Sequence, residues 1–246
     1  MNIGLIGRGR MGKLTFEAAE KSGHSVIKQF DSKDQLIATD QLENTECLID
    51  FSTPETVSTS ISIAVEAKVN IVIGTTGWDK DILSSISEKL DSALFVASNF
   101  SIGVNLFRLI IKNSTKLLDG LGGYDISVKE IHHMKKLDSP SGTALTISED
   151  IISQSSSKRS IYSGPPTESI SGDTLRITSE RINGVVGVHE VSFESGVDTI
   201  SLRHEMKDRS AFASGAIAIA EWLKDRSGIL NFNDYIADVY GISVKV

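Results

Sequence analysis

The chain has 246 residues, a formal net charge of −7 and a hydrophobic share of 40%, which is enough for a buried core in one large domain or two small ones. The acidic balance argues against general binding to nucleic acid or to an anionic membrane, and no apolar run is long enough to span a bilayer. The N-terminus lacks the features of a signal peptide, and the single cysteine, Cys47, favours a reducing compartment. We therefore expect a cytoplasmic protein.

The first hundred residues alternate between short apolar runs and amphipathic segments. The runs end close to Gly, Ser or Asp, as buried strands do. We predict strands at 2–7, 24–31, 46–51, 69–77 (with its Gly-Thr turn) and 93–98, and helices at 13–22, 54–67 and 79–90. This order predicts an α/β fold, a Rossmann-type doubly wound parallel sheet.

The pattern changes near Gly103. The next predicted helix, 104–118, has one apolar face made of Phe107, Ile110, Ile111, Leu117 and Leu118. We then predict a strand at 124–131, a helix at 143–153, a loop at 154–172, three partly alternating strands between 174 and 206, and a helix at 211–223. Long alternating strands are typical of antiparallel pairing, so the second half is predicted to be an α+β domain with a mostly antiparallel or mixed sheet. The last helix fits either half.

Residues 7–12, GRGRMG, have the G-x-G-x-x-G pattern between the first predicted strand and the first predicted helix. In this pattern Gly7 permits the tight turn, Gly9 lets the backbone approach a pyrophosphate, and Gly12 allows close packing. The helix N-terminus adds N–H groups and the positive end of its dipole. The motif predicts a dinucleotide phosphate site made of Gly7, Arg8, Gly9, Arg10, Met11 and Gly12.

Asp31 ends the second predicted strand, where dinucleotide-binding folds place a carboxylate that binds the adenosine ribose. A carboxylate there repels a 2′-phosphate and favours NAD. Lys33, Arg8 and Arg10 are close enough in the chain to neutralise such a phosphate. Both NADH and NADPH therefore remain open as cofactors.

Three further turns follow the third, fourth and fifth predicted strands. Ligands of open parallel sheets bind beyond the carboxyl ends of the strands, although each segment also fits an ordinary turn. Their shared location favours contact with the cofactor. The candidates are Ser52, Gly74, Thr75, Thr76, Ser98, Asn99 and Phe100.

Titratable residues crowd into the segment EIHHMKKLD, 130–138. A metal site is one reading, but neighbours on a strand point to opposite faces, which argues against one ion held by His132 and His133. A histidine that titrates near neutrality can donate a proton, and lysine supplies positive charge. The following Ser141-Gly142-Thr143 turn opens a helix whose N–H groups can hold a carboxylate. The segment predicts anion capture and proton delivery, with no metal.

The segment 130–144, EIHHMKKLDSPSGTA, resembles the signature of the 4-hydroxy-tetrahydrodipicolinate reductase (dihydrodipicolinate reductase) family, which reads approximately E-x-H-H-x-x-K-x-D-A-P-S-G-T-A. The segments 49–55, IDFSTPE, 72–78, VIGTTGW, and 97–105, ASNFSIGVN, look like further family segments in the same order. The resemblance spans most of the chain and is weakest over 150–180. It implies an NAD(P)H-dependent reductase of diaminopimelate and lysine biosynthesis.

The resemblance also implies an organisation and roles for particular residues. Residues 1–103 and 210–246 would form a dinucleotide-binding domain, and residues 104–209 a domain that binds substrate and builds a homotetramer. His132 and Lys136 would act in acid catalysis. The family often accepts both NADH and NADPH. Carboxylates of a small dicarboxylate substrate would be held by His133, Ser141, Gly142 and Thr143, and the residues that match cofactor-contacting positions are Gly74, Thr76, Asn99 and Phe100.

This chain departs from the family pattern at a few positions. GRGRMG is one residue shorter than the G-x-x-G-R-M-G loop of many members, and Ser139 replaces an alanine. Lys136, rather than its neighbour Lys135, has the spacing of the catalytic lysine, so Lys135 is expected to be solvated. Arg203, His204 and Arg209 are additional candidates for anion or structural contacts.

Two other functions fit the same residues. One is another two-domain NAD(P)-dependent dehydrogenase that acts on an amino or hydroxy acid. The other is a non-catalytic dinucleotide sensor, which would bind cofactor without hydride transfer. A sensor has no need of the acid–base cluster, and the cluster therefore favours an enzyme.

Overall fold

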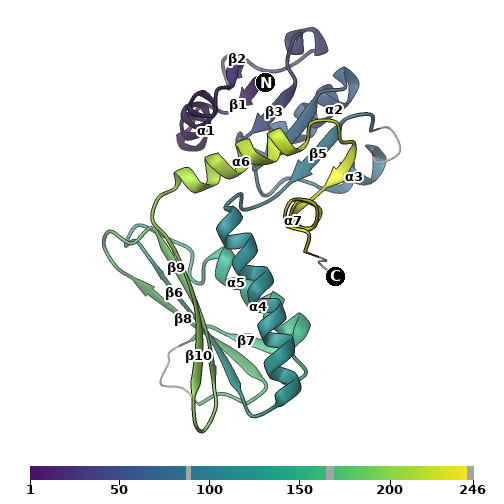
Figure 1. Cartoon of the computed structure of the whole chain (residues 1–246). Coiled ribbons are helices and arrows are strands. Elements are labelled where there is room, and N and C mark those ends of the chain that lie inside the picture. Colours follow the sequence, from purple (N-terminus) through teal and green to yellow (C-terminus); the bar gives the residue numbers. More distant parts are fainter. Residues whose placement is uncertain (87–89, 165–168, 243–246) are drawn as a thin grey trace. The chain divides into compact units, whose positions relative to one another are not determined.

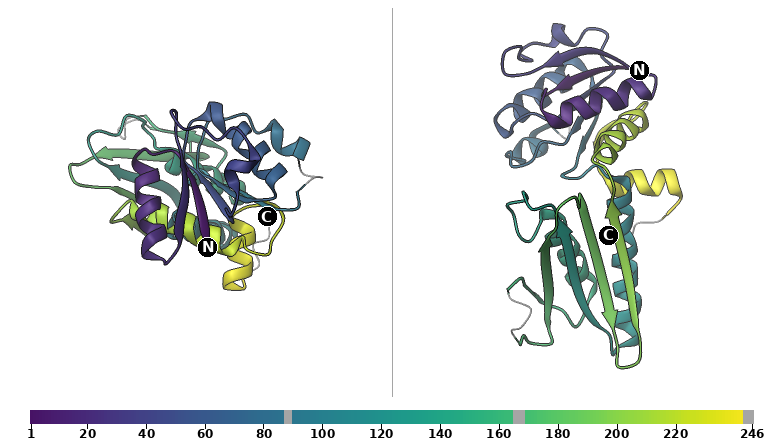
Figure 2. Two further views of the ribbon diagram at one scale, coloured as in Figure 1. Left: turned by 90° about the horizontal axis from the view of Figure 1, so that it is seen from above. Right: turned by 90° about the vertical axis from the view of Figure 1, so that its left-hand side faces the viewer.

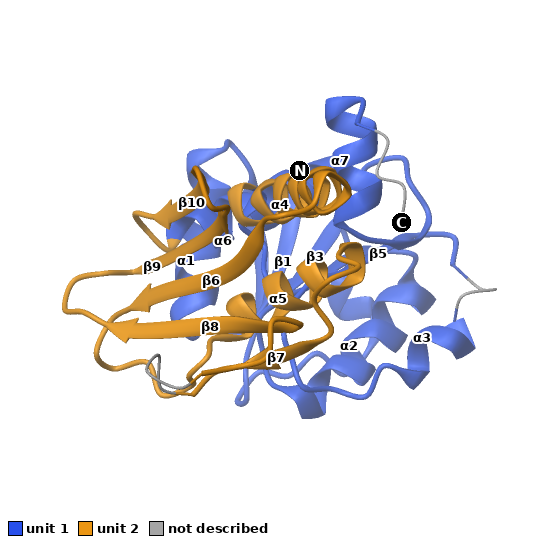
Figure 3. Ribbon diagram, turned by 90° about the horizontal axis from the view of Figure 1, so that it is seen from below, with its two compact units in different colours: residues 1–102, 210–246 blue, residues 103–209 orange. Residues whose placement is uncertain are grey.

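The computed structural model describes residues 1–86, 90–164 and 169–242. The chain divides into two compact units, shown in blue and orange in Figure 3. Unit 1 comprises residues 1–102 and 210–246, and unit 2 comprises residues 103–209. Most of the described elements are labelled in Figure 1.

Unit 1 is built on a six-stranded parallel sheet. Its strands lie in the order β11-β5-β4-β3-β1-β2, and every pair in this order is parallel. The central strands are short apolar runs buried on both faces, as parallel sheets require. The strands are β1 (Asn2–Ile6), β2 (Ser25–Phe30), β3 (Cys47–Asp50), β4 (Asn70–Ile73), β5 (Ala93–Val96) and β11 (Gly228–Leu230). This confirms the predicted Rossmann-type doubly wound sheet.

Helices cover both faces of this sheet (Figure 2). α1 (Arg10–Lys21) packs beside α6 (Ser210–Trp222), and α6 contacts β3 and β4. α2 (Pro54–Ala67) packs on the other face with α3 (Asp81–Ile86), in a cluster that includes Leu48, Ile61, Ile71 and Ile73. The predicted helix 79–90 includes residues 87–89, which lie outside the described residues.

Unit 2 has a five-stranded mixed sheet with the order β10-β9-β6-β8-β7. β6 pairs antiparallel with β9 and parallel with β8, so the mixed sheet predicted for this half is confirmed. α4 (Ile102–Leu121) and α5 (Gly142–Gln154) cover one face, and their core includes Phe107, Ile147 and Phe193. The strands are β6 (Asp125–His132), β7 (Ser160–Tyr162), β8 (Thr174–Arg181), β9 (Gly187–Glu194) and β10 (Thr199–Met206).

Several local predictions were wrong. On α4, Phe107, Ile111 and Leu118 are buried, but Ile110 and Leu117 are 50% and 68% exposed, because they lie at the margin of the buried stripe. The predicted loop 154–172 contains β7, an edge strand parallel to β8.

Among the described residues, three further elements were not predicted. They are the short 3-10 helix η1 (Thr39–Leu42), β11 and α7 (Phe232–Tyr240). α7 begins with a capping box in which Asn231 and Asp234 cap the first turn reciprocally, and this signal is visible in the sequence. None of the described helices combines the length and the apolar character that a membrane crossing needs.

Candidate functional site

The glycine turn after β1 needs its glycines for different reasons. Gly7 has a φ of +97°, and a Cβ on it would lie 2.3 Å from the carbonyl oxygen of Phe51. A Cβ on Gly12 would lie 1.8 Å from the carbonyl oxygen of Gly7. A Cβ on Gly9 would meet no atom within 4 Å. Gly7 and Gly12 therefore close the turn, whereas Gly9 leaves its outer surface open.

Helix α1 begins at Arg10, earlier than the predicted start at Lys13, so Arg10, Met11 and Gly12 form its first turn. Gly9 is the N-cap and makes no side-chain hydrogen bond to the turn. The first turn contains no acidic residue that would occupy the positive end of the helix dipole. An open glycine at such a helix start fits the pyrophosphate of a dinucleotide.

Asp31 directly follows β2, and its carboxylate is already partly engaged. Its Oδ1 accepts hydrogen bonds from the backbone N–H groups of Lys33, at 2.7 Å, and Asp34, at 3.0 Å. The Nε atom of Arg8 lies 3.4 Å from Asp31 Oδ2. These backbone hydrogen bonds, and then the charge of Arg8, lower the pKa of Asp31. The corner thus combines an ionised carboxylate with an exposed guanidinium, an arrangement that fits a ribose with or without a 2′-phosphate.

Asp50, at the end of β3, joins two of the predicted cofactor turns. It is fully buried, and its Oδ1 accepts hydrogen bonds from the hydroxyl groups of Ser52, at 2.5 Å, and Thr75, at 3.0 Å. The side chains of Ser52 and Thr75 therefore hold the turns after β3 and β4 together. Asp50 was not predicted as a site residue, although it lies in the family-like segment 49–55.

The remaining cofactor candidates divide by exposure. Thr76 and Ser98 are exposed. A Cβ on Gly74 would lie 2.0 Å from the ring of Phe51, so this glycine makes room for an aromatic side chain. Phe100 is 2% exposed, with its ring against Phe51, Phe95 and Phe232, and Asn99 accepts a hydrogen bond from the backbone of Ser101. The side chain of Phe100 is thus a core residue of unit 1.

In unit 2 the cluster around His132 centres on Glu130. Alternation along β6 turns both residues toward the face covered by α4 and α5, together with Ile126 and Val128. Glu130 is completely buried. Its Oε2 lies 3.2 Å from His132 Nδ1. No role was predicted for Glu130 from the sequence, although it is the first residue of the segment 130–144.

The other oxygen of Glu130 is held by groups from two further elements. Oε1 accepts hydrogen bonds from the backbone N–H of Ser141, at 3.0 Å, and from the hydroxyl of Ser179, at 2.8 Å. The guanidinium of Arg181 lies 3.4 Å from the same oxygen. Burial opposes the charge on Glu130, but hydrogen bonds from His132, Ser141 and Ser179 outweigh it and hold the pKa of the carboxyl below its usual range.

His189, on β9, is the third member of this cluster and was missed by the sequence reasoning. Its Nε2 lies 3.3 Å from Ser141 Oγ and 3.9 Å from Glu130 Oε2, and its ring is 5.2 Å from that of His132. Burial, and then the charge of His132, lower the pKa of His189 from 6.5 to about 4. His189 is therefore neutral at neutral pH. It has no motif of its own, because β-sheet pairing, and not sequence spacing, brings it to Glu130.

Glu130, His132 and His189 also offer one potential metal-ligand atom each, all within 4.8 Å of one another. From the sequence, a metal site was considered only for His132 and His133, which are neighbours in the chain. Ligands of a tetrahedral zinc ion lie about 3.3 Å apart, so the set would have to contract around an ion. The guanidinium of Arg181 beside Glu130 adds positive charge that disfavours a cation.

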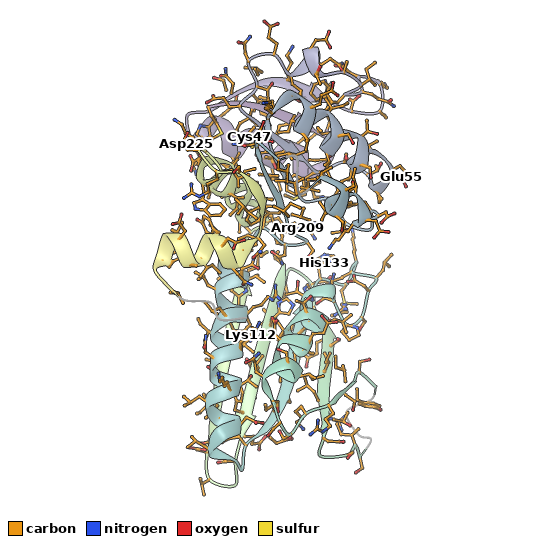
Figure 4. The ribbon with its side chains drawn as sticks, turned by 90° about the vertical axis from the view of Figure 1, so that its right-hand side faces the viewer. Cys47, Glu55, Lys112, His133, Arg209 and Asp225 are labelled. Atoms are coloured by element: carbon orange, nitrogen blue, oxygen red, sulfur yellow. The ribbon has the colours of Figure 1, made fainter. Side chains whose placement is uncertain are left out.

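His133 and Lys136 have partners different from those of His132. His133 Nε2 lies 3.0 Å from Arg209 Nη2, and the two side chains lie side by side in Figure 4. Lys136 Nζ lies 2.8 Å from Asp138 Oδ1. That hydrogen bond lowers the pKa of Asp138 against the opposing effect of burial. Lys135 is exposed, as expected for a solvated side chain.

The Ser-Gly-Thr turn is the start of α5. Ser141 is the N-cap, and its hydroxyl accepts a hydrogen bond from the backbone N–H of Ala144 at 3.1 Å. Gly142 is exposed, and a Cβ on it would meet no atom within 4 Å. The positive end of the α5 dipole therefore lies beside an open glycine, with the buried Ser141 as its anchor to Glu130.

The three additional candidates have different environments. Arg209 contacts His133. Arg203 lies 3.4 Å from carboxylate oxygens of Glu190 and Glu205, so its partners are other strand residues. The ring of His204 packs against Phe107, and burial lowers its pKa. Of the three, only Arg209 contacts a residue of the predicted substrate site.

Comparisons with known proteins find relatives that match almost the whole chain. A curated relative from Christiangramia forsetii, named 4-hydroxy-tetrahydrodipicolinate reductase, is 36% identical over 98% of this chain and 99% of its own length. A relative of the same name from Rickettsia rickettsii is 35% identical over 94% of this chain and 96% of its own length. The solved structure of dipicolinate-bound dihydrodipicolinate reductase from Paenisporosarcina sp. TG-14 has the same fold, with a TM-score of 0.80 at 22% identity over 96% of this chain and 99% of that one.

Both parts of the chain match family descriptions. Residues 1–100 match the family described as dihydrodipicolinate reductase, N-terminus, and residues 103–236 match the one described as dihydrodipicolinate reductase, C-terminus. The two matches meet close to the junction between unit 1 and unit 2. The chain therefore belongs to the dihydrodipicolinate reductase family.

Proposed function

We propose that this chain catalyses the NAD(P)H-dependent reduction of 4-hydroxy-tetrahydrodipicolinate to tetrahydrodipicolinate in diaminopimelate and lysine biosynthesis. The observation that carries the proposal is the match of both parts of the chain to this family, with relatives of that name similar over almost their whole length. The glycine turn of unit 1 and the acid–base cluster of unit 2 supply the two kinds of chemistry that such a reduction needs.

Unit 1 is the proposed site of NADH or NADPH, which when bound supplies the hydride. The start of α1 holds the pyrophosphate through backbone N–H groups, with Gly9 as the point of close approach. Asp31 accepts hydrogen bonds from the adenosine ribose, and Arg8 is the group that pairs with a 2′-phosphate when one is present. The turns held by Asp50 line the ribose and nicotinamide side.

Unit 2 is the proposed site of the substrate, a small cyclic dicarboxylate. The start of α5, at Gly142 and Thr143, binds one carboxylate, and His133 with Arg209 adds positive charge and hydrogen-bond donors. His132 and Lys136 act in acid catalysis, because the hydroxyl group of the substrate must leave as water and the ring must gain a proton after the hydride has arrived. The ion pair of Lys136 with Asp138 opens when a substrate carboxylate competes for the ammonium group.

The direct test is the loss of reduced-nicotinamide absorbance with the purified chain. Substrate is made in place from pyruvate and aspartate semialdehyde by the preceding synthase, and NADH and NADPH are supplied separately. We expect oxidation that depends on the synthase, and a His132→Asn variant with unchanged cofactor affinity and a kcat lower by about a hundredfold. Cofactor binding without any synthase-dependent oxidation would contradict the proposal.

We further propose that the protein is a cytoplasmic homotetramer. α4 and α5 cover one face of the unit 2 sheet, and within the described part of the chain the opposite face carries partly exposed polar side chains such as Lys129, Glu190 and Ser201. Pairing of such faces between copies would bury them. The buried single cysteine, Cys47, is consistent with a reducing compartment.

A further inference from the structure

We infer that Glu130 is a positioning residue for the acid–base step: it holds the Nδ1 proton of His132 on its Oε2 atom, so that Nε2 is the atom that exchanges a proton with substrate. The inference rests on the proposed function for its catalytic consequence. Its structural part, the position of the proton on His132, stands on the geometry of unit 2 alone and is measurable without substrate.

The two oxygens of the Glu130 carboxylate have different surroundings. Oε1 is occupied by the Ser141 N–H and the Ser179 hydroxyl, with Arg181 beside it. Oε2 faces His132 Nδ1 at 3.2 Å. Both atoms are buried, and among the described residues neither Oε2 nor Nδ1 has a hydrogen-bond partner. Each of these buried atoms has only the other as a possible partner. A proton on the ring nitrogen allows a hydrogen bond between them and so lowers the cost of burying both.

The charge state of Glu130 supports this assignment. Hydrogen bonds keep the carboxyl ionised in spite of burial, and an ionised carboxylate is only an acceptor. His132 must therefore be the donor between the two. The arrangement is that of a carboxylate that fixes the tautomer and orientation of a catalytic imidazole, a role known from other enzyme classes.

His189 does not compete for this proton. It is neutral at neutral pH, and its Nε2 is closer to Ser141 Oγ, at 3.3 Å, than to Glu130 Oε2, at 3.9 Å. Its ring stands edge-on to that of His132, with an interplanar angle of 71°. The uncharged ring of His189 thus packs against the His132 ring and limits its rotation.

The opposite edge of the His132 ring remains accessible. A Cβ on Gly187 would lie 3.1 Å from His132 Nε2, so the glycine leaves space beside this atom. About a tenth of the His132 side chain is exposed. When the imidazolium form gives its Nε2 proton to the substrate, the neutral ring keeps its proton on Nδ1 and its bond to Glu130. The ring takes up a new proton on Nε2 without changing orientation.

Glu130 also joins the acid to the anion site. The same carboxylate that faces His132 accepts the N–H of Ser141, the N-cap of α5. One buried group therefore sets the position of the proton donor relative to the helix start that is proposed to bind the substrate carboxylate. Misplacement of either partner is expected to lower kcat more than it raises KM.

The test compares Glu130→Gln with Glu149→Gln, the same change at an exposed position of α5. Protein labelled with ¹⁵N-histidine is studied above neutral pH by two-bond nitrogen–proton correlation, and a His132→Asn variant assigns the His132 signals. We expect wild-type His132 to carry its proton on Nδ1, with Nε2 unprotonated. In Glu130→Gln this preference should be lost and kcat should fall by about tenfold to a hundredfold, with the cofactor KM unchanged. Glu149→Gln should match wild type in both measurements.

The outcomes separate this inference from the proposed function. A wild-type protein without reductase activity, but with the Nδ1 proton in place, would count against the function and leave the position of the proton established. A wild-type His132 protonated on Nε2 would overturn the inference whatever the activity, and so would a folded Glu130→Gln variant with wild-type kcat. If Glu130→Gln does not fold, the tautomer of His132 in the wild-type protein tests the inference. Ser179→Ala, which removes a donor to Oε1 only, is expected to keep the proton of His132 on Nδ1.

Discussion

A substitution of Gly187 is the most direct test of the space around His132. Its backbone conformation is open to any L-residue, but a Cβ would lie 3.1 Å from Nε2 and 3.3 Å from Cδ2 of the His132 ring. We expect Gly187→Ala to displace the ring by a few tenths of an ångström and to lower kcat by about tenfold. Urea unfolding should change by less than about 1 kcal/mol.

The matched control for Gly187 is Gly196→Ala. A Cβ on Gly196 would meet nothing within 4 Å, and this glycine lies in the turn between β9 and β10. Steady-state kinetics should show wild-type kcat for the control. Equal kcat in the two variants would mean that the edge of the ring beside Gly187 has no part in turnover.

His189 gives a prediction for stability as a function of pH. The unfolded chain takes up a proton on this histidine near pH 6.5, whereas the folded chain does so only near pH 4. Because the unfolded state binds more protons in this window, the free energy of unfolding falls as the pH is lowered through it, by at most about 3 kcal/mol. Above this window the contribution of His189 is constant.

Urea unfolding of wild type and His189→Gln at a series of pH values measures this effect. The variant should lose less stability between pH 6.5 and 4, while the contribution of other groups, such as His204 and Glu130, is common to both proteins. Parallel curves for the two proteins would show that His189 titrates normally in the folded state.

The residues of the site differ in how far sequence alone could identify them. His132, Lys136 and Ser141 lie within one short segment. Their residue types, close to a strand end and a helix start, indicate proton delivery and anion binding. Ser179, Arg181 and His189 reach Glu130 through pairing of β6 with β8 and β9. A strand register cannot be read from one sequence. Asp50 was missed because its buried carboxylate acts through Ser52 and Thr75, not through a motif of its own.

At the scale of elements, the turn between β1 and α1 separates a folding role from a binding role within one motif. Gly12→Ala places a Cβ 1.8 Å from the carbonyl oxygen of Gly7, and we expect it to cost on the order of 3 kcal/mol of stability. Gly9→Ala meets no atom and should cost less than about 1 kcal/mol. It should nevertheless weaken NADH binding by about tenfold or more, because its Cβ stands where the pyrophosphate approaches.

Thermal or urea unfolding and titration of NADH fluorescence check these two variants together. The expected result is a crossed pattern, with stability lost in Gly12→Ala and affinity lost in Gly9→Ala. If Gly9→Ala binds NADH with wild-type affinity, the pyrophosphate does not bind at this helix start.

Elements with a strong apolar signal were predictable, and those defined by tertiary contacts were not. The strands β1, β3, β4 and β5 are short buried runs, and they were all predicted. β7 and β11 have three residues each and exist because a neighbouring strand offers an edge. The prediction of the buried face of α4 was wrong at Ile110 and Leu117, because these exposed residues are as apolar as their buried neighbours.

At the scale of the whole molecule, the proposed tetramer is testable from mass alone. Light scattering after gel filtration should give four times the 26.6 kDa of the chain. Ser192 and Ser201 face each other with their hydroxyl groups 3.3 Å apart on β9 and β10, on the sheet face that α4 and α5 leave uncovered. Ser201→Arg should lower the mass by introducing like charges between copies, whereas Ser62→Arg on the exposed side of α2 should not. An unchanged mass in both variants would mean that this face is not the interface.

Because unit 1 is formed by two separate segments of the chain, the two units cannot complete their folding in sequence order during translation. Ribosomes deliver residues in order, so every residue of unit 2 has emerged before α6 and β11 exist. Until then, β3 and β4 lack the helix that packs on one of their two faces, and β5 lacks its outer neighbour. The unit that stands second in the sequence is therefore the first that can finish folding during translation, and the N-terminal sheet waits for α6 and β11 to leave the ribosome. A nascent chain stalled before α6 would display an apolar sheet face and an open strand edge, the kind of surface that chaperones hold.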